Sequence, residues 1–158
     1  MNIATFPPQS RVWIYQANPA FAPSDIPQLE AMLQQFAQEW VSHSRQLRAA
    51  ATLQHQRFIV LMVDETRAGA SGCSIDSSVR FVQQLEQRFG VQLLDRMTFA
   101  YQIGQEVHTA DRATFAQLYA DGTINDETLV FDNLVAHKAA FDTAWLKPLK
   151  QSWHYRMV

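Results

Sequence analysis

The chain has 158 residues and a formal net charge of −2 at pH 7, with thirteen basic and fifteen acidic side chains. This length fits one domain with one core, and the small negative charge gives no general attraction to nucleic acid. Hydrophobic residues make up 47% of the chain and charged residues 18%, which is typical of a globular protein and not of a disordered one. We therefore expect one folded domain over residues 1–158, with residues 1–10 as a flexible N-terminal tail.

Targeting signals and membrane spans are missing from the sequence. The longest purely apolar run, residues 58–63, is far shorter than the roughly 20 residues that a membrane-spanning helix needs. The first ten residues, MNIATFPPQS, lack the basic start and apolar stretch of a signal peptide. A single cysteine forms no internal disulfide and suits a reducing compartment. These features predict a cytoplasmic protein.

The first half of the chain alternates between strand and helix patterns. Residues 11–16, RVWIYQ, are rich in β-branched and aromatic residues and predict a strand. Two further strands are expected over residues 47–53 and 57–64, and the second is apolar on both faces, as a central strand should be. Between the first two strands, a helix over about residues 25–43 follows from apolar residues at helical spacing. These residues are Ile26, Leu29, Leu33, Phe36 and Trp40.

The second half continues with a helix that begins near Cys73 and ends at Gly90, a residue that favours the left-handed conformation of a helix end. Later elements follow from the same patterns. They are extended segments over residues 91–94 and 97–107, a helix over 112–120, a strand over 128–135 and a helix over 137–145.

Together these elements predict an α/β fold, with α+β as the alternative. We expect a single layered domain with a mixed β-sheet of about five to seven strands packed against about four helices. The strand order does not follow from one sequence, because several right-handed, unknotted arrangements fit the same string of elements.

Several well-known chemical motifs are missing from the sequence. It has no GxxxxGK[ST] loop for nucleotide phosphates and no GxGxxG for a dinucleotide. GxSxG, HExxH and CxxC are also missing, and the five histidines have no close metal-ligand spacing. We therefore expect no cofactor and no metal site.

The most distinctive stretch joins the strand over residues 57–64 to the next helix. Asp64 ends the strand, and Cys73 begins the helix after a short loop. Ligands often bind beyond the ends of strands, and a helix N-terminus attracts anions. The expected function is therefore binding of a small anionic molecule or a protein partner at residues 73–80. The ligand-binding side chains would be Ser74, Ser77, Ser78 and Arg80.

Three alternatives remain open for these residues. In the first, the chain is an enzyme that uses Cys73 as nucleophile or redox thiol, with Asp64 and Asp76 as further candidate catalytic residues. Asp76 opposes this chemistry, because its charge discourages a neighbouring thiolate. In the second, the serines only cap the helix and Cys73 is buried packing. In the third, the protein is a structural homodimer whose aromatic tail, with Trp153 and Tyr155, forms the interface.

Three segments together resemble a family of small uncharacterised bacterial proteins of about this length. The segments are RVWIYQAN at residues 11–18, VDE at 63–65 and SGCSIDSSVRF at 71–81. Some members of the family carry the label "ABC transporter ATPase", although the Walker A loop that such an ATPase requires is missing here. The resemblance implies a single full-length domain and brings no mechanism.

Overall fold

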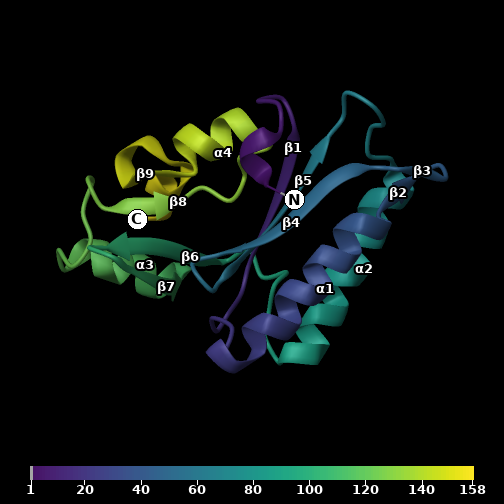
Figure 1. The fold of residues 1–158 in the computed structure, drawn as a ribbon. Helices are drawn as coiled ribbons and strands as arrows, with labels where there is room; N and C mark the ends of the chain where they lie inside the picture. The colour runs from purple at the N-terminus through teal and green to yellow at the C-terminus, as the bar shows by residue number, and fades with distance from the viewer. Residues whose placement is uncertain (1) are drawn as a thin grey trace.

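A three-stranded antiparallel sheet forms the centre of the protein. The structure, a computed structural model, describes residues 2–158. The central sheet contains β1 (Arg11–Gln16), β5 (Phe58–Asp64) and β4 (Arg48–Gln54) in the order β1-β5-β4 (Figure 1). All seven residues of β5 are buried, because other layers cover both faces of this strand.

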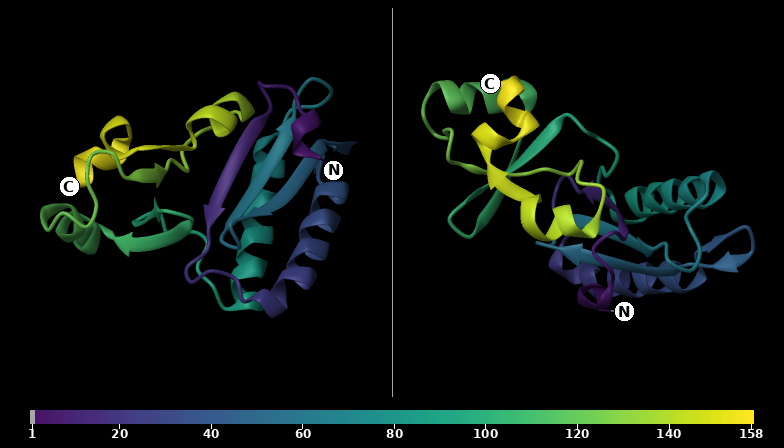
Figure 2. Two further views of the ribbon diagram at one scale, coloured as in Figure 1. Left: turned by 60° about the vertical axis from the view of Figure 1, so that its left-hand side comes forward. Right: turned by 90° about the horizontal axis from the view of Figure 1, so that it is seen from above.

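Two helices cover one face of the central sheet, as Figure 2 shows. They are α1 (Ile26–Glu39) and α2 (Gly72–Phe89), each of which turns one apolar side toward the strands. The first core lies between these helices and the sheet. Its members include Leu29, Leu33, Ile59, Leu61, Val82 and Leu85.

A second antiparallel sheet, in the order β7-β6-β8-β9, lies on the other side of the central sheet (Figure 2). Phe58, Val60 and Met62 of the central sheet pack there against Phe131 and Trp145 in a second core. A third core lies beneath helix α3 and the C-terminal turns and includes Phe99, Phe115 and Leu149. The elements of this half are β6 (Thr98–Ile103), β7 (Glu106–Asp111), α3 (Arg112–Ala120), β8 (Leu129–Phe131), α4 (Lys138–Ala144) and β9 (Leu146–Pro148).

The prediction of one layered domain is confirmed in its α+β form, with four α-helices among the described residues. Every strand pairing described is antiparallel, however, and the strands form three sheets where one mixed sheet was expected. The reason is the connections: β4–β5 and β6–β7 are hairpins, and α2 carries the chain from the central sheet into the second one instead of back beside β5.

The first predicted helix is shorter than expected. It ends at Glu39, and Trp40 is already extended with φ −71° and ψ 125°. A small hairpin follows, formed by β2 (Val41–Ser42) and β3 (Arg45–Gln46). His43 and Ser44 adopt positive φ at its tip, a turn conformation that apolar periodicity does not report.

Three differences concern the second half. The extended segment 97–107 is split into β6 and β7 at Gly104, whose φ of +60° makes the turn. Strand β8 ends at Phe131 because the chain turns there, and the Asp132 carboxylate accepts the Leu134 N–H within that turn. The three-residue strand β9 was not predicted, since three residues are too few for a pattern.

Within residues 2–158 there are also four short 3-10 helices: η1 (Ile3–Thr5), η2 (Pro23–Asp25), η3 (Leu149–Gln151) and η4 (Trp153–Met157). The expected N-terminal tail holds η1, and Phe6 beyond it is buried in the second core. The guanidinium carbon of Arg48 lies 4.4 Å from the centre of the Phe6 ring. Among the helices of residues 2–158, none is long and apolar enough to cross a membrane.

Candidate functional site

The predicted site at the start of α2 is a well-capped helix end. The Ser71 hydroxyl accepts the N–H of Ser74, and the Ser74 hydroxyl accepts the N–H of Ser71. Ser77 Oγ donates to the Ser74 carbonyl at 2.8 Å, and Ser78 Oγ donates to the Ile75 carbonyl at 2.6 Å. The hydroxyl groups of these serines therefore hydrogen bond within their own helix.

The other predicted residues are spread around this helix end. Cys73 is exposed, contrary to the packing alternative that would bury it, and Asp76 is exposed beside it. No hydrogen bond joins Cys73 to a histidine among the described residues. Arg80 and Ser77 line a shallow groove between α1 and α2. Cys73 lines none of the pockets described below.

Asp64 is buried and fully engaged with its neighbours. Its Oδ2 accepts from Arg48 Nη1 at 2.7 Å, and its Oδ1 accepts from both the N–H and the hydroxyl of Thr66. Burial acts to raise the pKa of Asp64, but the hydrogen bonds from Thr66 and Arg48 outweigh it and lower the pKa. This carboxylate fastens the end of β5 to β4, and no hydrogen bond connects it with Cys73 or Asp76.

A cavity of about 190 Å³ lies where the outer edge of β1 meets the second sheet and the C-terminal turn. Its wall is largely apolar. Apolar lining residues include Ile14, Leu93, Phe99, Ala100, Phe131 and Leu134. Its polar lining residues include Asp95, Thr98 and four others: Gln16, Arg96, Asn133 and His154. These four residues are separated by up to 138 positions in the sequence, so only the fold brings them together.

His154 is the most deeply buried polar residue that lines this cavity, with 1% of its surface exposed. The Trp153 ring stacks on its imidazole with 3.7 Å between centroids, and Phe99 meets it edge-on. Burial lowers the pKa of His154 to about 4, and the nearby Asp132 carboxylate reverses only part of that effect. The imidazole is therefore neutral at pH 7.

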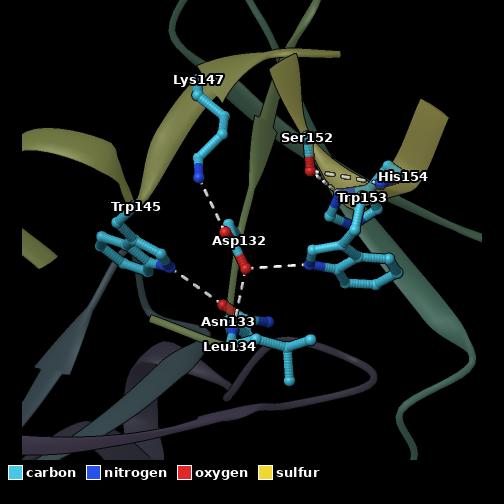
Figure 3. A network of polar contacts seen from close by, with 8 residues as sticks. All are labelled: Asp132, Asn133, Leu134, Trp145, Lys147, Ser152, Trp153 and His154. Atoms are coloured by element: carbon cyan, nitrogen blue, oxygen red, sulfur yellow. Dashed lines mark hydrogen bonds and ion pairs between the residues drawn. The ribbon is translucent and has the colours of Figure 1, made fainter. Parts of the chain in front are cut away.

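The tautomer of His154 is assigned from its contact with the Ser152 hydroxyl. Ser152 Oγ accepts the backbone N–H of His154 at 3.3 Å and lies 2.5 Å from Nδ1 of the ring (Figure 3). We assign the Ser152 hydroxyl as the donor to Nδ1, an assignment that places the ring proton on Nε2. Nε2 makes no hydrogen bond with any described residue.

The Asp132 carboxylate fixes the position of side chains around His154. Its Oδ2 accepts from Lys147 Nζ at 2.8 Å, and its Oδ1 accepts from Trp153 Nε1 at 2.9 Å, as Figure 3 shows. Burial acts to raise the pKa of Asp132, but the hydrogen bonds from Lys147 and Trp153 outweigh it and lower the pKa. Because Trp153 is held by its indole N–H, the stacked His154 ring is held in place as well.

A chain of side-chain amides crosses from the central sheet to the second one. Asn133 Nδ2 donates to Gln16 Oε1 at 3.1 Å, and Gln16 Nε2 donates to the Thr98 carbonyl at 3.0 Å. Trp145 Nε1 donates to Asn133 Oδ1 at 2.9 Å. These contacts fix the two amides that line the cavity.

Arg96 supplies the one cationic side chain of the cavity lining. It is exposed and forms no ion pair within residues 2–158. Its neighbours Leu93 and Asp95 are fixed, because Glu86 accepts the Leu93 N–H and Asp95 accepts from Met97 and Thr98. The Arg96 guanidinium therefore lies at the cavity on an ordered segment and has no carboxylate partner among the described residues.

Fold and site together define an α+β domain with a small, mostly apolar cavity between its two larger sheets. Comparison of the chain with protein-family models, with curated proteins and with solved structures gives no match. The function is therefore argued from the geometry of the site.

Sequence patterns missed this cavity. The aromatic tail with Trp153 and Tyr155 was predicted as an interface and not as the wall of a cavity. Asp132, Asn133 and Arg96 carried no signal, because each lies in a short polar connection of a kind that most proteins contain.

Proposed function

We propose that the protein binds a small organic anion with a flat apolar body in the cavity beside β1. The observation that carries this proposal is a mostly apolar cavity lined by a buried, neutral histidine whose Nε2 has no protein partner. Small-molecule sites are commonly of this kind, apolar with a few placed polar groups.

The size of the cavity limits the ligand. An apolar cavity of about 150 Å³ accepts benzene. The volume of about 190 Å³ here leaves room for one ring with a small substituent. A ring of this size would contact Ile14, Phe99 and Phe131 and remove apolar surface from water, which supplies the non-directional part of the affinity.

The polar groups of the cavity indicate which substituent the ring of the ligand carries. Arg96 offers a guanidinium that can hold a carboxylate through charge-assisted hydrogen bonds. The Nε2–H of His154 would donate to an acceptor on the ligand and so obtain the partner that it lacks. A carboxylate or a similar anion supplies acceptors of this type. The Asp95 carboxylate also lines the cavity, but it already accepts hydrogen bonds from Met97 and Thr98.

The N-terminus of α2 is a less favourable binding site for an anion than the cavity. Its serine hydroxyls already hydrogen bond within the helix, and Cys73 lines none of the described pockets. Anion binding at residues 73–80 stays a prediction, and the cavity is the site that we favour.

The test is a titration of the ¹⁵N-labelled protein with benzoate, followed by amide chemical shifts, with benzyl alcohol as the neutral ligand of the same shape. We expect benzoate to shift the amides of Ile14, Gln16, Phe99 and Leu134. Arg96→Gln should weaken benzoate binding about tenfold or more, because a charge-assisted hydrogen bond contributes about 1.5–3 kcal/mol. It should leave the weaker binding of benzyl alcohol unchanged.

Arg67→Gln is the matched control, since Arg67 is exposed and does not line the cavity. The proposal fails if millimolar benzoate and benzyl alcohol both leave the cavity amides unshifted. It also fails if Arg67→Gln weakens benzoate binding as much as Arg96→Gln does.

A further inference from the structure

The two larger sheets end in four outer strands, and three of these edges have features that discourage pairing with another chain. Edge strands that lack such features tend to add a partner strand. At β1, Val12 donates to the Ala136 carbonyl near one end, and Asn18 exchanges two hydrogen bonds with Gln92 beyond the other. Strand β7 carries Glu106, His108 and Asp111, and β9 has only three residues, one of which is Pro148.

Strand β4 has the fewest of these features, although the Leu47 N–H just before it donates to the Trp40 carbonyl. It runs from Arg48 to Gln54 as RAAATLQ, with no proline and with no charge after Arg48. It pairs with β5 on one side and with no strand on the other among residues 2–158. The short hairpin of β2 and β3 precedes it but forms a separate sheet.

The direction of each backbone group of β4 follows from the register. Val12 directs its N–H away from β5, so Met62 opposite it directs its backbone toward β4 and pairs with Ala50. Since backbone direction alternates along a strand, Ala49, Ala51 and Leu53 direct theirs outward. No hydrogen bond within the described chain uses these groups.

A groove of about 450 Å³ runs beside this edge, between β4 and α1. On the helix side, the polar residues that line it are Glu30, Gln34 and Gln38. Their spacing of four residues places them in one row along α1. The row carries a single charge, at one end.

We propose that β4 is a dimer interface, at which it pairs antiparallel with β4 of a second copy around a two-fold axis beside Ala51. This pairing places Ala49 opposite Leu53 of the second copy, and Ala51 opposite its own counterpart. The unpaired donors and acceptors of one edge then meet those of the other, as a two-fold interface requires. The two central sheets join into one continuous sheet with three strands from each copy.

Charge favours a second copy as the occupant. With Gln34 in the middle of the row on α1, the two-fold axis places Glu30 of one copy near Gln38 of the other. No like charges then face each other across the interface. The interface is separate from the cavity beside β1, so its test is independent of ligand binding.

Amide hydrogen exchange measured by NMR tests the pairing directly. In a dimer, the outward amides of Ala49, Ala51 and Leu53 are protected, and their protection falls as the protein is diluted. The inward amides of Ala50 and Thr52 are the internal control, because they bond to β5 at every concentration. Fast exchange of the outward amides beside slow exchange of the inward ones, at all concentrations, would overturn the proposal.

Two variants of α1 test the same interface without touching a strand. Gln34→Lys places two positive charges near the axis and should weaken the dimer about fivefold or more, measured by sedimentation equilibrium. Gln35→Lys is the matched control on an exposed position outside the groove and should leave the dimer unchanged. A monomeric wild-type protein, or equal effects of the two substitutions, would refute the interface.

Discussion

His154 is the residue whose chemistry the fold changes most. In an unfolded chain its imidazole accepts a proton near pH 6.5. In the folded protein it is enclosed by Trp153, Phe99 and Phe115, and burial lowers its pKa to about 4. Nε2 of the same ring makes no hydrogen bond with the protein and is available to the proposed ligand. One side chain therefore affects both the stability of the protein and the proposed binding.

The lowered pKa of His154 predicts a loss of stability in acid. Between pH 6.5 and about 4 the unfolded chain binds a proton at this position and the folded chain does not, so the free energy of unfolding falls as the pH falls. The expected loss from this one group is about 3 kcal/mol. His154→Gln removes that contribution, so urea unfolding at pH 7 and near pH 4 should show a flatter pH dependence than in the wild type.

His137→Gln, at an exposed position, is the matched control and should keep the pH dependence of the wild type. An identical pH dependence in the wild type and in His154→Gln would contradict the assignment of a buried, neutral imidazole.

Helix α2 shows how local sequence sets the ends of an element. Ser71 and Ser74 close its N-terminus through reciprocal hydrogen bonds, and Gly90 closes its C-terminus with φ +65°. The Gly90 N–H donates to the Glu86 carbonyl, and the Glu86 carboxylate accepts the Leu93 N–H beyond the helix. The end of α2 therefore also positions the segment that carries Arg96 to the cavity.

Gly72, the first residue of α2, and Gly90, its C-terminal cap, allow a matched test of this helix end. Gly90→Ala should lower the free energy of unfolding by about 1 kcal/mol, because alanine is strained at a positive φ. Apart from the neighbouring residues in the chain and the backbone of the helix itself, no atom lies within 4 Å of a Cβ built on Gly90 or on Gly72, so neither substitution causes a clash. Gly72→Ala, inside the first turn, should be neutral or slightly stabilising. Urea unfolding measures both, and an equal loss in the two variants would contradict the role of Gly90 as the helix end.

At the scale of the whole molecule, β5 joins the two halves. Its odd-numbered residues, such as Ile59 and Leu61, pack under α1 and α2, and its even-numbered residues, such as Val60 and Met62, pack against the second sheet. Loss of either layer would expose one full face of a strand that is buried on both. The two halves should therefore unfold together.

Indole N–H signals in NMR spectra report this cooperativity, because each has a defined partner. Trp40 donates to the Ser74 carbonyl in the first half, whereas Trp145 donates to Asn133 and Trp153 to Asp132 in the second. We expect the three native signals to disappear at one urea concentration, as in a two-state transition. Earlier loss of the Trp153 signal than of the Trp40 signal would show that the halves unfold separately.

Most elements with a strong local pattern were predictable. The alternation in residues 11–16, the double-sided apolar run of β5 and the helical spacing before Gly90 each report on one element, and each element is present. Less predictable were the turns at His43 and Gly104 and the three-residue strand β9, since one or two residues decide them. At the candidate site, the sequence pointed to residues 73–80, whereas the enclosed volume lies beside β1.

By itself, the sequence determined that helices and strands share one layered domain, the central place of β5 and the capped ends of α2. These follow from periodicity and from residues that act on their immediate neighbours. Only the tertiary structure decided that Gln16, Arg96, Asn133 and His154 share one cavity and that the β4 edge stays unpaired. The physical reason is that burial, pKa and strand pairing depend on contacts between residues far apart in the chain, which no local pattern records.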